Sequence, residues 1–143
     1  MLVRLMYASR AADEADGDTL AAILKASKEH NPRVGVTGVL CFCANARIYL
    51  QVLEGGRNAV SALYNRISQD LRHRDVALLS YEEIGERSFS HWSMGQVNMS
   101  RLNPALVLKY SENARLDPYA VSGQASLALF NELVATASIG VQV

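Results

Sequence analysis

The sequence lacks the features that direct a chain to nucleic acid or to a membrane. Its 14 basic residues are balanced by 14 acidic ones, so it has no basic excess of the kind that nucleic-acid binders carry. Its longest apolar runs fall far short of the ~20 residues that cross a bilayer. The N-terminal stretch MLVRLMYAS carries Arg4 inside its apolar run, with no cleavage pattern after it, which favours a first strand over a signal peptide. We expect no membrane association and no direct nucleic-acid binding.

Cysteine is also scarce. The two cysteines, Cys41 and Cys43, are two residues apart in an expected strand, where they point the same way and do not suit a disulfide. No cluster of cysteine and histidine completes a metal site. We interpret both as free thiols, expect no metal, and predict a reduced, cytoplasmic setting.

What the sequence does contain is an interleaved pattern of strands and helices. Apolar residues make up 50% of the 143 residues and charged residues 20%, which is typical of one globular domain with a short extension. The order β-α-β-β-α-β-β has no Gly-rich phosphate loop and predicts an α+β, ferredoxin-like sandwich, a five-stranded mixed sheet with two helices on one face. The expected strands are residues 2–9, 36–43, 47–54, 76–84 and 91–99, and the expected helices are 18–31 and 57–69.

The ends of these elements carry local signals. Asp18 is placed to cap the first helix, and Pro32 lies just beyond its expected end. A short turn that contains Ala44 and Asn45 joins the second and third strands into a hairpin.

The last part of the chain has a helical pattern of its own. It begins with Asn103-Pro104, a helix start. We therefore divide the chain into a domain of residues 1–100 and a helical extension of residues 101–143, which we expect to cover the second face of the sheet. The helical apolar residues are Leu127, Phe130, Leu133 and Val134, and the second face includes Leu2, Met6, Leu50 and Val52.

A glutamine stands inside the strand IYLQVLEGG, residues 48–56. Strand alternation puts Gln51 on one face with Tyr49 and Leu53. If both faces of the sheet are covered, the amide of Gln51 is buried, and an unpaired buried amide costs on the order of 1–3 kcal/mol. Gln51 therefore needs a hydrogen-bonding partner.

Both predicted helices change from apolar to polar along their inward stripes. In the first helix, Leu20 and Leu24 are followed on the same face by Ser27 and Asn31. In the second helix, the stripe of Val60, Leu63 and Ile67 continues on Asp70, with Arg66 one turn before it.

Each polar residue has an ordinary structural explanation as well. Asn31 suits a C-cap, Asp70 a solvated loop, and Tyr7 a core position with its hydroxyl at the surface, while Trp92 and Met94 suit a core. Together they suggest a polar-lined slot between two helices above a sheet, where a planar ligand with several hydrogen-bonding edges fits. The residues alone leave both interpretations open.

The sequence resembles the BLUF family, the blue-light sensors that use FAD. The resemblance covers about residues 1 to 100, and residues 101–143 resemble the helical cap of short, stand-alone members. Five segments carry it in the family's order: VRLMYAS, ASKEHNPRVGVTGVL, IYLQVLEG, RISQDLRH and RSFSHWSM.

The resemblance implies a flavin site in the predicted slot. The isoalloxazine ring of FAD, with FMN able to substitute, would slide between the two helices. Asn31 would bond a flavin carbonyl and the ring N–H edge, Asp70 the opposite polar side, and Ile67 would pack on the ring face. The implied cofactor-binding residues are Ser27, His30, Asn31, Gln51, Arg66, Ile67, Asp70 and His73.

The resemblance also implies photochemistry instead of enzyme catalysis. Blue light would drive an electron and a proton from Tyr7 through Gln51, leaving the hydrogen bonds of the flavin rearranged. Ser9, Trp92 and Met94 would take part in signalling. The fifth strand and the C-terminal helices would then pass the change to a downstream signalling protein, and we expect a homo-oligomer.

Two alternatives remain on the same fold. One is a small acylphosphatase-like hydrolase that uses an arginine and Asn31, although the loop ASRAADEADGD is acidic and poorly suited to phosphate. The other is a regulatory module that binds a small molecule in the dark.

Overall fold

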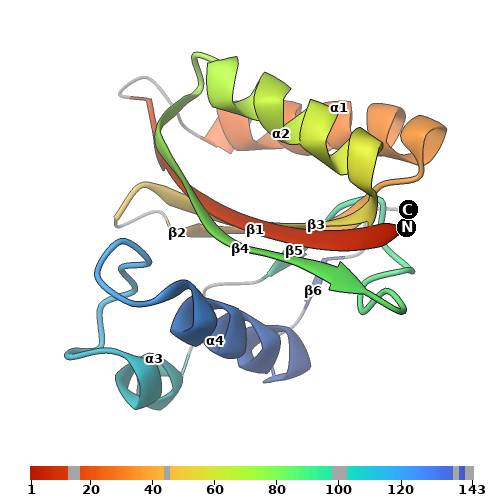
Figure 1. The fold of residues 1–143 in the computed structure, drawn as a ribbon. Coiled ribbons are helices and arrows are strands. Elements are labelled where there is room, and N and C mark those ends of the chain that lie inside the picture. The colour runs from red at the N-terminus through yellow and green to blue at the C-terminus, as the bar shows by residue number, and fades with distance from the viewer. Residues whose placement is uncertain (13–16, 44–45, 98–102, 137–138, 141–143) are drawn as a thin grey trace.

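The computed structural model describes residues 1–12, 17–43, 46–97, 103–136 and 139–140, which are arranged around one sheet (Figure 1). The strand order is β4-β1-β3-β2-β5-β6. Strand β2 pairs parallel with β5, whereas β1 pairs antiparallel with β3 and β4. The predicted mixed sheet of five strands is confirmed, and a two-residue strand extends its edge. The strands are β1 (Leu2–Ala11), β2 (Thr37–Cys43), β3 (Ile48–Gly56), β4 (His73–Ile84), β5 (Gly95–Val97) and β6 (Ile139–Gly140).

Helices cover both faces of the sheet. Helices α1 (Gly17–Val34) and α2 (Arg57–Gln69) lie side by side on one face. Helices α3 (Pro104–Tyr110) and α4 (Gly123–Thr136) lie on the other (Figure 1). The Asn103 side chain accepts a hydrogen bond from the Ala105 backbone N–H, so it caps α3 as the sequence indicated.

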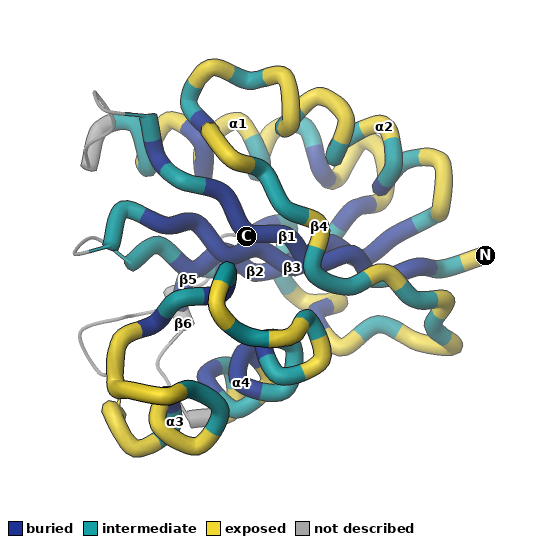
Figure 2. Tube along the Cα trace, turned by 60° about the vertical axis from the view of Figure 1, so that its left-hand side comes forward, coloured by how far each residue is buried: buried dark blue, intermediate teal, exposed yellow. Residues whose placement is uncertain are grey.

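The sheet separates two apolar cores, and Figure 2 shows its central strands as the most deeply buried part of the molecule. Strand alternation produces this division, because successive side chains point to opposite faces. The core under α1 and α2 contains Tyr7, Tyr49 and Leu53, and the core under α4 contains Met6, Leu50 and Val52. Leu2, expected on the second face, is only half-buried.

Both cysteines belong to the second core and neither forms a disulfide, as predicted. Cys41 is fully buried, and burial raises the pKa of its thiol to about 12. That thiol is therefore protonated and unreactive at neutral pH.

Helix α1 is longer than its proline suggested. Pro32 lies inside the helix and not beyond it. The helix ends at Val34, and the next residue, Gly35, has a φ of 71° that allows the Val36 N–H to donate to the Asn31 carbonyl at 3.0 Å. This is the Schellman ending, in which a left-handed glycine closes the helix. Pro32 is tolerated because it stands in the last turn, where little of the helical hydrogen bonding follows it.

The predicted fifth strand is the largest error. Strand β5 covers Gly95–Val97 alone, so Trp92 and Met94 belong to the segment that precedes it. Residues 98 and 99 of the prediction lie outside the described residues, as do the turn residues Ala44 and Asn45 and the side chain of Asp18.

Candidate functional site

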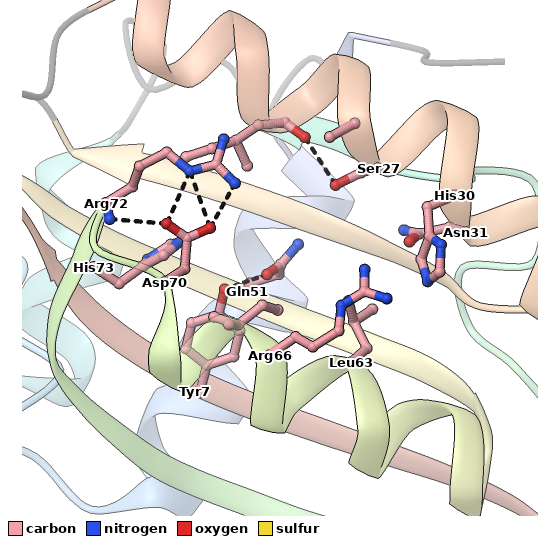
Figure 3. A pocket seen from close by; sticks show the side chains of 13 residues that line it. Tyr7, Ser27, His30, Asn31, Gln51, Leu63, Arg66, Asp70, Arg72 and His73 are labelled. Carbon is pink, nitrogen blue, oxygen red and sulfur yellow. Dashed lines mark hydrogen bonds and ion pairs between the residues drawn. The ribbon is translucent and has the colours of Figure 1, made fainter.

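A cleft of about 140 Å³ opens between α1 and α2, above β1 and β3 (Figure 3). All eight residues predicted to bind a cofactor line it, together with Tyr7. Sequence reasoning missed four lining residues. The full lining is Tyr7, Ile23, Ala26, Ser27, His30, Asn31, Gln51, Leu63, Arg66, Ile67, Asp70, Arg72 and His73.

The floor of the cleft contains the partners of Gln51. Tyr7 on β1 stands directly opposite Gln51 on β3, and the Tyr7 hydroxyl donates to Gln51 Oε1. On its other side, Gln51 Nε2 donates to the Met94 sulfur at 3.1 Å. A thioether is a weak acceptor, so the buried amide is held firmly by the phenol and loosely by the methionine.

The phenol of Tyr7 is well isolated from water. Tyr7 is 1% exposed, and its ring packs against Tyr64 with centroids 5.6 Å apart. Burial raises the pKa of Tyr7, and the neighbouring Tyr64 hydroxyl raises it further. The phenol is therefore neutral at every physiological pH. The pairing of β1 with β4 shifts register between Met6 and Tyr7, an irregularity of the kind that re-aims side chains at functional sites.

Asn31 is buried at one end of the cleft. It is 1% exposed, and its Nδ2 donates to the Ser93 carbonyl at 2.8 Å. Within the described parts of the chain, nothing donates to its Oδ1. Its side chain does not cap α1, so the ordinary explanation of this residue is wrong. Asn31 instead offers a buried acceptor to the cleft.

Asp70 and Arg72 form an ion pair at the opposite end (Figure 3). Asp70 follows the last residue of α2, and its carboxylate accepts hydrogen bonds from the Arg72 backbone and guanidinium at 2.6–3.0 Å. These bonds lower the pKa of Asp70, so the carboxyl is ionised at neutral pH. Arg72 was missed because a basic residue in a turn is usually solvated.

His73 opens β4 and is buried behind this pair. Its Nδ1 lies 2.7 Å from the hydroxyl of Ser9, which is itself buried and does not line the cleft. Burial lowers the pKa of His73, so the ring is neutral at pH 7. Ser9 thus fixes the orientation of a ring that borders the cleft.

The rim and walls complete the site. Ile23 faces Leu63 and Ile67 across the cleft from the other helix, so two apolar surfaces enclose the space. The Arg66 side chain is exposed at the rim and has no hydrogen-bonding or ion-pair partner among the described residues. Ser27 donates to the Ile23 carbonyl at 3.0 Å.

Met94 and Trp92, which the sequence could not rank, lie on different sides of the sheet. Met94 is 0% exposed in the core under α1 and α2, in contact with Gln51. Trp92 packs against the second core, with its ring centroid 6.3 Å from that of Phe89.

These groups fit a flat cofactor with polar edges. Apolar walls suit ring faces, while the Asn31 amide, the Gln51 amide and the Asp70–Arg72 pair present donors and acceptors at the edges. The space is smaller than the roughly 300 Å³ of the smallest drug-sized pockets, but the exposed Arg66 side chain at its rim can rotate outward. Fold and site together define a small α+β domain with a slot for a planar cofactor.

Comparison with known proteins identifies the family. The family model "Sensors of blue-light using FAD" (BLUF) matches residues 2–95, and the chain belongs to that family. It is therefore a flavin-binding sensor of blue light. Within the described residues, the longest helices are not apolar enough to span a membrane.

Two solved structures resemble nearly the whole chain. "BlsA photo-activated state" is 31% identical with a TM-score of 0.82, covering 96% of this chain and 99% of that one. "BlrB - a BLUF protein, dark state structure" is 32% identical with a TM-score of 0.78, covering 94% and 95%. They are described as a photo-activated state and a dark state, which agrees with the expectation of a light sensor.

A curated relative shows the same sensor inside a larger protein. Photoactivated adenylate cyclase subunit beta of Euglena longa is 32% identical over 94 residues, or 65% of this chain and 11% of the relative. The chain thus spans about a tenth of that protein.

Proposed function

We propose that the cleft binds the ring system of FAD and that Tyr7 and Gln51 convert absorbed light into a change at Met94. The observation that carries this proposal is the buried chain of hydrogen bonds from the Tyr7 phenol through the Gln51 amide to the Met94 sulfur. The chain starts at an oxidisable group on the cleft floor and ends at a residue that the segment before β5 can move.

Most lining residues have a role in holding the ring. The free Oδ1 of Asn31 accepts from a ring N–H, and the Asp70–Arg72 pair binds the opposite polar edge. Ile67 packs on a ring face. These contacts address the part that FAD and FMN share, so FMN is expected to substitute. The remaining lining groups, Ser27, His30, Arg66 and His73, bind the ring edge and the chain attached to it.

A bound flavin supplies absorption of blue light and, once excited, a one-electron oxidant. Tyr7 loses an electron, which makes its phenol strongly acidic. The proton passes to Gln51 Oε1, the acceptor that the phenol already contacts. When the electron returns, the proton returns to Tyr7. The Gln51 amide is left with a different hydrogen-bond pattern, reached by rotation or by a change of tautomer.

The output starts at the weak bond from Gln51 to Met94. If the amide rearranges, this bond is lost, and the segment that carries Met94 and Trp92 can shift. We propose that residues 101–143 serve as the output extension, because Trp92 already packs on the core that α4 covers. A downstream signalling protein would recognise the altered surface, with the sensor acting as a homo-oligomer.

The test is a spectrum recorded before and after blue light. Purified protein loaded with FAD should be yellow and show a reversible red shift. Tyr7→Phe and Gln51→Leu should keep the flavin and lose the shift, since each removes one member of the hydrogen-bonded chain. Tyr64→Phe is the matched control, because this phenol contacts the Tyr7 ring but does not bond Gln51. A normal photocycle in Tyr7→Phe would rule the mechanism out.

A further inference from the structure

The connecting segment, residues 85–94, joins β4 to β5 and reaches both cores of the molecule. Phe89 and Trp92 belong to the core under α4, whereas Met94 belongs to the core under α1 and α2. A displacement at Met94 can therefore reach the second core without passing through the sheet. How far it travels depends on what holds the rest of the segment.

The firmest hold comes from a buried carboxylate on β3. Glu54 is 0% exposed. Its Oε1 accepts from the Phe89 backbone N–H at 2.8 Å and its Oε2 from the Ser88 N–H at 3.0 Å. Arg4 Nε donates to the same carboxylate at 2.8 Å, which compensates the buried charge. Arg4 also bonds the Ser88 hydroxyl at 2.7 Å.

Glu54 and Gln51 hold the middle and the last residue of the connecting segment from a single strand. They are three residues apart on β3 and reach opposite faces of the sheet. The hold at Glu54 consists of charge-assisted hydrogen bonds, which are about twice as strong as neutral ones. The holds near Met94 are neutral: Gln51 donates an N–H to the Met94 sulfur, and Asn31 donates to the Ser93 carbonyl at 2.8 Å. A change in the Gln51 amide will therefore loosen the Met94 side chain before it affects the bonds at Glu54.

Other contacts hold the segment on either side of Ser88 and Phe89. Arg87 donates to the Gly35 carbonyl at 2.7 Å. The Gly38 N–H donates to the Trp92 carbonyl at 3.1 Å. These bonds keep the segment folded onto the sheet when the bonds at Glu54 weaken, so removing the Glu54 charge should shift the segment without detaching it.

We propose that Glu54 is a positioning residue of the light switch, whose buried carboxylate fixes Ser88 and Phe89 so that the Met94 sulfur lies against the Gln51 amide. The role of Glu54 in light switching rests on the proposed function. The positioning itself is a property of the protein without flavin, and it can be tested separately.

The first experiment uses flavin-free protein and Glu54→Gln. The amide that replaces the carboxylate offers one acceptor oxygen and turns an NH₂ group toward donors, so at least one of the three N–H groups loses its bond. We expect the ¹³C-methyl NMR signal of Met94, assigned with Met94→Leu, to shift. The fluorescence of Trp92, the single tryptophan, should change with it.

The matched control is Arg57→Gln. It removes an exposed charged hydrogen bond to Glu83 at 2.5 Å and does not touch the connecting segment. Both signals should stay as in the wild type. If Glu54→Gln does not fold, Arg4→Lys serves instead, since it keeps the charge but loses the guanidinium contacts, and it should move both signals in the same direction by less.

The second experiment measures dark recovery in flavin-loaded protein. Glu54→Gln should retain a red shift but recover at a rate changed by about tenfold or more, which corresponds to about 1.4 kcal/mol in the barrier. A folded Glu54→Gln with Met94 and Trp92 signals unchanged overturns the positioning role. Moved signals with unchanged recovery overturn its role in the switch. A chain that binds no flavin refutes the proposed function, and the flavin-free measurement still decides the positioning.

Discussion

At the scale of single residues, the site depends on side chains that can both donate and accept. Gln51 is 3% exposed, and a leucine there would avoid the cost of burying an amide. A leucine, however, could not connect the Tyr7 phenol to Met94. The buried amide therefore costs some stability but provides hydrogen bonds that can rearrange. They can rearrange because the oxygen bonds a phenol strongly whereas the nitrogen bonds a thioether weakly.

His73 makes the stability of the protein depend on pH. Burial lowers its pKa below the ordinary value of 6.5 in the folded state, so the unfolded chain binds more protons once the pH falls below about 6.5. Stability should therefore be full above this value and decline as the pH falls toward the folded pKa. The decline can be measured as urea unfolding midpoints of flavin-free protein from about pH 7.5 to about pH 5, the range in which a histidine titrates.

The dependence of stability on pH, and not the stability at any one pH, is diagnostic for His73. His73→Gln should flatten this decline, whereas His91→Gln, which changes an exposed histidine, should leave it unchanged. The lowered pKa of Asp70 acts in a separate window, below its ordinary value of 3.8. An unaltered slope in His73→Gln would assign the decline to other groups.

At the scale of elements, the sequence predicted what depends on local pattern. Helix α2 matches its predicted range, 57–69, because an apolar stripe and the glycines before it define its start and its face. The end of α1 was wrong because Gly35 closes the helix and Pro32 does not. A proline stops a helix only where it removes hydrogen bonds that the rest of the helix needs.

The errors at the site arose where tertiary contacts, and not the local sequence pattern, determine the structure. The segment around Trp92 and Met94 looked like a strand because both residues are apolar. In the structure, these two apolar side chains pack into two different cores. Arg72 was missed because its role depends on a turn that directs it back to Asp70. Tyr7, Asn31 and Gln51 could be found from the sequence, since a polar residue on an apolar face is a local signal.

Gly123 positions helix α4 against strand β4. A Cβ atom there would lie 1.7 Å from the Leu79 carbonyl oxygen. Because this clash is with the backbone, no side chain of that strand can relieve it by moving. Gly123→Ala should therefore push the helix from the sheet and cost about 1–3 kcal/mol, as overpacking usually does. Gly85→Ala is the control, because nothing lies within 4 Å of its Cβ position. Equal unfolding midpoints for the two variants would show that α4 does not need this close approach.

At the scale of the whole molecule, two cores share one sheet. Strands β1 and β3 supply side chains to both, with Tyr7 and Gln51 on one face and Met6 and Val52 on the other. Neither core can lose its packing without disturbing the strands that carry the photochemical pair. This shared sheet allows a change at the cleft to be felt under α4, and it predicts that the cores unfold together.

Phe130 tests that cooperativity. It is 0% exposed, with its ring 6.3 Å from that of Phe89. Phe130→Ala should lower the free energy of unfolding by about 3–5 kcal/mol. Trp92 fluorescence reports the second core, and release of flavin reports the first. Because both cores share the sheet, the two signals should change with one midpoint in urea. Leu108→Ala, at a position 51% exposed on α3, should change little. If Trp92 loses its signal while flavin stays bound, the core under α4 unfolds independently, and the output must reach a partner by another path.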